Sequence, residues 1–269
     1  MSLQPDNTTV AYQSASATAL VTNAGVGGVA NAPSGQGATI TMTTNASGVT
    51  TIVFNIPTTG ATFTQQFSSS VWDYGGPISM NAPSAAQLVT ILRDIFGFPN
   101  TNGAVITQTI GAQTLNSAAY GLWASGDNAT AGRAGTFAFG NLTPMASVPT
   151  TGSATFNGTT TGVGGATGGS TVYALQGSAQ IIANFATQSA TTNLTNLSTQ
   201  NISTNAVGAL PNLSGTSTIS GNAYSGPIAG TNLTGTINGN FYGPAALETA
   251  GVWQASGGGN TWIGSYGAK

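Results

Sequence analysis

The chain has 269 residues, of which 40% are hydrophobic and only 3% are charged. Its three basic residues are too few for a groove that binds nucleic acid or for a cluster that binds anionic lipid. It has no Cys and no His, which excludes disulfides and the common thiolate and imidazole ligands of metals. No apolar run is long enough to predict a transmembrane helix. The solvent-facing surface must therefore be built from Thr, Ser, Asn, Gln and Gly.

The first part of the chain predicts short strands. Residues 1–37 are small and polar, and they predict an N-terminal arm with one strand around 12–21. Apolar and polar residues alternate in 38–44, 49–55 and 61–67. Because successive side chains of a strand point to opposite faces, this alternation predicts half-buried strands.

One segment, residues 84–96, predicts a helix. Ser84 is suited to cap its N-terminus, and Gln87, three residues later, completes a capping box. The apolar residues fall on one stripe, which consists of Leu88, Ile91, Leu92, Ile95 and Phe96. Gly97 and Pro99 then favour termination. We expect this helix to dock on a sheet; the alternative is a helix that binds a partner.

The second half of the chain predicts many short antiparallel strands. In 232–242, Leu233, Ile237 and Phe241 face one side, with a glycine between each pair. Glycine at inward positions lets a strand coil tightly and leaves room for large neighbours, as a small barrel requires. The strand spacing predicts a closed barrel or a sandwich. The Gly-rich segment 162–169 lacks the Gly-Lys-Ser/Thr ending of a phosphate loop and predicts a hairpin tip.

Several segments in chain order resemble one family. The segment GNFYGPAALE at 239–248 resembles the C-terminal signature of transferrin-binding-protein-like surface proteins; the matching residues are Phe241, Tyr242, Gly243, Pro244 and Glu248. The last strand and four upstream segments are similar to the same family, at 261–268, 120–123, 137–140, 143–144 and 148–158.

This resemblance implies a mainly β protein in which a smaller β-rich, handle-like domain with one α-helix precedes an eight-stranded antiparallel β-barrel. Residues 1–37 would then form the N-terminal arm, 38–117 the handle-like domain with the helix 84–96, and 118–269 the barrel. The resemblance also implies an extracellular location or the bacterial outer surface. The sequence departs from haem-scavenging relatives because it has no His for haem ligation.

Catalysis is not expected from this composition. Catalytic groups usually come from His, Cys, Lys or paired carboxylates, whereas this chain has no His, no Cys and five acidic residues. We therefore predict no enzymatic activity, no catalytic residues, no cofactor and no metal site. For Glu248 we expect a structural role, either capping the turn after Pro244 or pairing with an Arg.

The most site-like stretch is 72–77, where Trp72 and Tyr74 flank Asp73. Two aromatic rings beside an acid could stack on a sugar or another planar ligand. Core packing at a domain junction is the alternative interpretation. The same two interpretations apply to Phe96 and Phe98.

Two functions fit these features. The first is a non-enzymatic secreted or cell-surface protein that binds an extracellular ligand or protein partner, for nutrient acquisition or host-factor capture. The alternative is a self-assembling structural surface protein, such as a layer, a filament or an adhesin. A surface almost without charge lacks the repulsion that keeps copies apart, so it favours self-association.

Overall fold

The structure is a computed structural model that describes residues 9–13, 15–22, 25–32, 39–45, 50–56, 61–67, 78–80, 102–128, 131–167 and 171–269. Most of these residues lie in β-strands, and the helical elements among them are the short 3-10 turns η1 (Met145–Ser147) and η2 (Pro244–Ala246). The helix predicted for 84–96 lies outside the described residues. Within them, no helix has the length and apolar character needed to cross a membrane.

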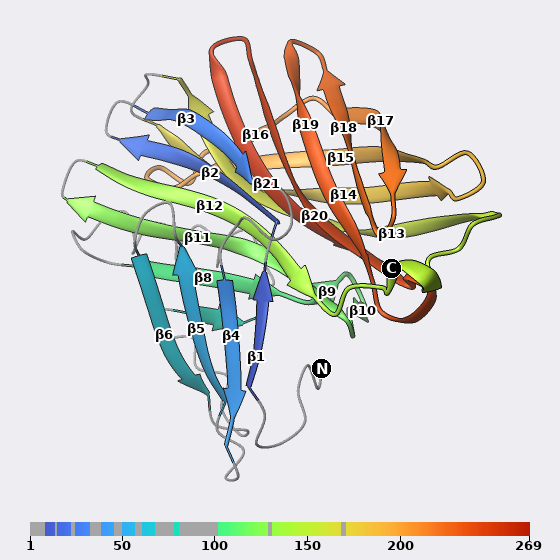
Figure 1. Ribbon diagram of the computed structural model, residues 1–269. Coiled ribbons are helices and arrows are strands. Elements are labelled where there is room, and N and C mark those ends of the chain that lie inside the picture. The colour runs from blue at the N-terminus through green and yellow to red at the C-terminus, as the bar shows by residue number, and fades with distance from the viewer. Residues whose placement is uncertain are drawn as a thin grey trace.

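The C-terminal half closes into an antiparallel barrel (Figure 1). Eight strands pair in a ring, and β14 pairs with both β13 and β15 to complete it. A ninth strand, β16 (Val207–Ala209), pairs only with the far end of β15. The ring strands are β13 (Ser153–Ala166), β14 (Val172–Asn184), β15 (Ser189–Asn201), β17 (Leu213–Ser220), β18 (Ala223–Gly230), β19 (Leu233–Tyr242), β20 (Glu248–Gly257) and β21 (Asn260–Ala268). The mainly β class and the eight-stranded barrel are thus confirmed.

Two sheets, of six and four strands, and a two-stranded ribbon precede the barrel along most of the chain. A six-stranded sheet has the order β3-β2-β12-β11-β8-β7, and a four-stranded sheet has the order β1-β4-β5-β6. The six-stranded sheet consists of β2 (Ala15–Thr22), β3 (Gly25–Ala32), β7 (Ile78–Met80), β8 (Asn102–Thr107), β11 (Ala118–Asn128) and β12 (Ala131–Gly140). The other strands are β1 (Thr9–Gln13), β4 (Thr39–Thr44), β5 (Thr50–Ile56), β6 (Ala61–Phe67), β9 (Thr109–Ile110) and β10 (Gln113–Thr114).

Strand pairing differs from the division drawn from the sequence. Strands β11 and β12, grouped with the barrel in 118–269, pair with β8 and β2 in the six-stranded sheet. Strands β1 to β3, assigned to an arm in 1–37, belong to the two larger sheets. The physical reason is that sheet membership depends on pairing over long sequence separations, which a local pattern does not contain. The division of the chain into domains at 38 and 118 stays a prediction.

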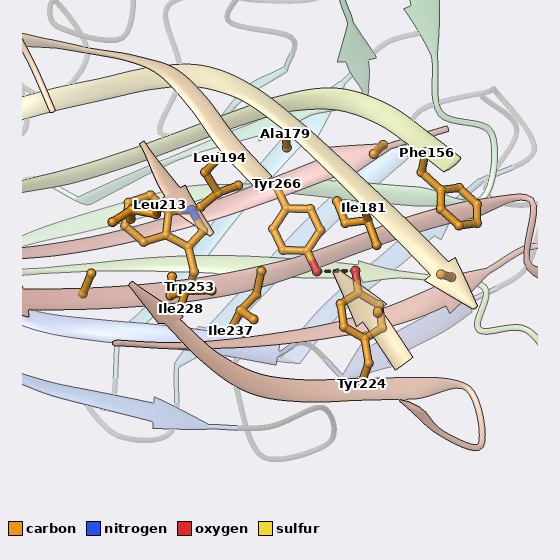
Figure 2. Packing of buried hydrophobic residues seen from close by; sticks show 14 of the residues in the cluster. Phe156, Ala179, Ile181, Leu194, Leu213, Tyr224, Ile228, Ile237, Trp253 and Tyr266 are labelled. Atoms are coloured by element: carbon orange, nitrogen blue, oxygen red, sulfur yellow. Dashed lines mark hydrogen bonds between the residues drawn. The ribbon is translucent and has the colours of Figure 1, made fainter. Parts of the chain in front are cut away.

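The barrel interior is filled by side chains from all its walls (Figure 2). The prediction for 232–242 is confirmed, because Leu233, Ile237 and Phe241 are buried in this core. Large rings stand opposite glycines: a Cβ on Gly164 would lie 2.4 Å from the ring of Trp262. The segment 162–166, predicted as part of a hairpin tip, is therefore the end of strand β13 and makes room for an aromatic ring.

The six-stranded sheet packs against the outer face of β20 and β21, as the adjacent strands in Figure 1 show. Every residue of β21 after Asn260 is buried, because one face lines the barrel core and the other meets this sheet. Ser265 Oγ donates a 2.7 Å hydrogen bond to the carbonyl oxygen of Gly121. Thr136 Oγ1 donates a 3.1 Å bond to the carbonyl oxygen of Gly264. These bonds join the sheet to the barrel.

Candidate functional site

The residues proposed from the sequence as ligand or interface positions all lie outside the described residues. They are Trp72, Asp73, Tyr74, Phe96 and Phe98. A binding role for them stays a prediction.

The signature segment forms the turn between β19 and β20. Phe241 points into the barrel, where its ring centroid lies 5.4 Å from that of Phe185 and 5.3 Å from that of Tyr224. The next residue, Tyr242, belongs to the cluster between barrel and sheet. Gly243 has φ of 75°, a left-handed conformation that favours glycine, and Pro244 then starts η2. This turn sets the direction in which β20 starts.

Glu248, the first residue of β20, ties the barrel to the segment before β11. Its buried carboxylate accepts hydrogen bonds from the backbone N–H groups of Asn116 (2.6 Å), Ser117 (2.8 Å) and Ala118 (3.1 Å). Lys269 Nζ lies 3.8 Å from Glu248 Oε1. The two specific roles expected for Glu248 are thus replaced by another structural role. The described contacts cap a distant segment instead of the turn after Pro244, and the paired cation is a Lys instead of an Arg.

Buried hydroxyl groups connect strands inside the barrel. The hydroxyl groups of Tyr224 and Tyr266 share a 2.5 Å hydrogen bond (Figure 2). The hydroxyl group of Tyr224 also lies 2.7 Å from Thr249 Oγ1. Trp253 Nε1 donates a 2.9 Å bond to Thr160 Oγ1. These bonds satisfy polar groups that would otherwise destabilise the apolar core.

The tyrosines of the core are held in the neutral form. Burial raises the pKa of Tyr224 and of Tyr266 well above the ordinary value of a phenol. Burial also raises the pKa of Tyr120, at the sheet-to-barrel contact, to about 12, although its hydrogen bond with Thr159 opposes the shift. A tyrosine binds haem iron as a phenolate. These buried phenols are therefore unsuited to hold a haem, and the described part of the chain has no cluster of three or more His, Cys, Asp or Glu.

The most site-like feature of the described residues is a hollow at one end of the barrel. We call this end the barrel mouth; it is formed by 141–152 together with the turns 185–188, 221–222 and 243–247. The hollow has a volume of about 200 Å³, and its walls include Met145, Val148, Phe185, Ile219, Thr150 and Gln188.

Large apolar side chains are exposed at the barrel mouth, and one of them, Met145, lines the hollow. Met145 is 73% exposed, Leu247 58% and Leu142 43%. Met145 belongs to η1 and Leu247 follows η2, and these two turns are neighbours. Leu142 forms an isolated β-bridge with Tyr242. Exposed apolar groups gathered around a hollow are typical of a surface that binds another molecule.

The mouth has almost no electrostatic field of its own. From Ala134 to the end of the chain, Glu248 and Lys269 are the only charged residues, and they lie beside each other. An incoming charged group would lose water without gaining a partner. The hollow is therefore suited to an uncharged group.

The C-terminal half is thus a closed barrel that is filled by its own side chains, is docked on a β-sheet and carries a small hollow at one end. Residues 148–269 match the family described as the C-lobe and N-lobe β-barrels of transferrin-binding protein B. This match covers the barrel, 122 of the 269 residues of the chain. A search of curated protein sequences found no match.

Three solved structures illustrate what the fold is similar to. A structure described as a surface lipoprotein is 12% identical, with a TM-score of 0.47 and coverage of 96% of this chain and 98% of that one. A mutant of transferrin-binding protein B from Actinobacillus pleuropneumoniae H49 is 13% identical, with a TM-score of 0.47 and the same coverage of 96% and 98%. The haemoglobin receptor HpuA from Kingella denitrificans is 14% identical, with a TM-score of 0.38 and coverage of 82% and 84%. These structures illustrate the fold alone, and the family match covers the barrel.

Proposed function

We propose that this protein is a non-enzymatic binding protein of the bacterial cell surface, or a secreted form of one, that captures an extracellular protein or ligand in nutrient acquisition. The observation that carries the proposal is the match of 148–269 to the barrels of transferrin-binding protein B, a protein named for the host iron carrier that it binds. A related name, haemoglobin receptor, is given to one of the similar structures.

The surface of the chain supports a protein partner over haem itself. The barrel interior is occupied by aromatic and aliphatic side chains, and its buried tyrosines favour the neutral form. Binding must then take place on the outside. The contact would depend on apolar groups and neutral hydrogen bonds, because the barrel has too few charges for ionic contacts.

The contact residues proposed for this partner are the aromatic positions Trp72, Tyr74 and Phe98, together with Asp73 and Phe96. Aromatic side chains supply much of the binding energy in protein interfaces. Replacing Trp72 or Phe98 with Ala should therefore weaken capture more than tenfold, whereas Ile182→Ala, on the barrel wall, should leave it unchanged.

The test is capture by the immobilised full chain from host serum, followed by titration with purified haemoglobin and transferrin. The expected result is saturable binding of one protein that is nearly independent of salt. Titration with haem and a glycan array cover small ligands. If serum capture, both proteins, haem and glycans all give no saturable binding, the proposed function is wrong.

A further inference from the structure

We draw no further inference here: the strongest candidate, the hollow at the barrel mouth that Met145, Phe185 and Ile219 line, carries nothing, because nothing in the described part of the structure shows what covers it.

Discussion

At the scale of single residues, Glu248 carries more of the structure than its place in a signature suggests. Its carboxylate is the shared acceptor for three backbone N–H groups of the segment that leads into β11. A buried donor that loses its acceptor destabilises the fold by about 1–3 kcal/mol. The side chain therefore fixes the position of the sheet relative to the barrel.

We predict that Glu248→Ala lowers the free energy of unfolding by about 3 kcal/mol or more, since several buried N–H groups lose their acceptor together. Glu248→Gln should lower the free energy of unfolding by less, because the amide oxygen of Gln still accepts a hydrogen bond from the backbone. Its NH2 group faces a backbone donor and cannot accept one. Urea unfolding followed by circular dichroism measures both. Lys269→Ala is the control and should change stability by less than about 1 kcal/mol, as expected for a partly exposed ion pair. Equal effects of the Ala substitutions at 248 and 269 would contradict this role.

The buried tyrosines predict a fold that is sensitive to alkali. In the unfolded chain each phenol titrates near pH 10. In the folded protein burial raises the pKa of Tyr120 to about 12, and it raises the pKa of Tyr224 and of Tyr266 well above the ordinary value of a phenol. The folded state thus holds these protons more tightly. Its stability is complete below about pH 10 and falls as the pH rises above that value.

A shift of two pKa units corresponds to about 3 kcal/mol, which sets the upper limit expected from Tyr120 alone. Urea unfolding at a series of pH values should show a constant midpoint up to about pH 9 and a steep fall above about pH 10. The ultraviolet absorbance of phenolate should rise together with unfolding. Because the chain has seven tyrosines, phenolate formation at more than four of them in a protein that remains folded would contradict the burial of these three hydroxyl groups.

At the scale of the elements, the barrel strands fit because large rings stand against glycines. A Cβ added to Gly264 of β21 would lie 2.3 Å from Cε2 of Trp253 on the neighbouring strand β20. The ring cannot move away, because its Nε1 donates to Thr160 on the far side of β21. The glycine is therefore a requirement of packing.

We predict that Gly264→Ala destabilises the protein by about 1–3 kcal/mol, because overpacking forces a core ring out of its position. Gly208→Ala is the matched control: the nearest atom to its new Cβ would be the hydroxyl of Thr199, at 3.0 Å, which can turn away. Its effect should stay within about 0.5 kcal/mol. Thermal unfolding of both variants decides between them, and a harmless Gly264→Ala would show that the ring has room.

The sequence predicted the individual strands better than it predicted how they are grouped into sheets. Alternation identified the inward residues of 232–242, because a strand with one wet face must alternate. By contrast, residues 118–124 are buried on both faces, and their run of Ala, Tyr, Gly, Leu and Trp does not alternate. That run is typical of a strand between two layers. It indicates that β11 lies in the sheet against the barrel.

The candidate site was less predictable because its parts come together only in the closed barrel. Met145, Phe185 and Ile219 meet at the hollow from three separate segments. Nothing near Met145 in the sequence indicates that its side chain is exposed. The acceptor role of Glu248 likewise depends on backbone groups about 130 residues earlier. A local sequence pattern predicts which face of a strand is buried. Contacts over such sequence separations can be predicted only when the pairing order of the strands is known.

At the scale of the whole molecule, the scarcity of charge should make stability nearly independent of salt. Ionic strength acts mainly on exposed charges, which are screened over about 10 Å at 0.1 M salt. This chain has three basic and five acidic residues in 269, and Glu248 is buried among backbone donors. Folding then depends on apolar burial and neutral hydrogen bonds, which sodium chloride changes little.

We predict that raising sodium chloride from about 0.05 M to about 0.5 M changes the free energy of unfolding by less than about 0.5 kcal/mol, because few exposed charges are present to be screened. Sodium sulfate serves as the positive control, since its exclusion from the protein surface should raise the unfolding midpoint. A larger change in sodium chloride would mean that the few charged groups contribute strongly to the fold. The same reasoning extends to partner capture, where Asp73 is the one charged group among the proposed contact residues, so capture should weaken only slightly at high salt.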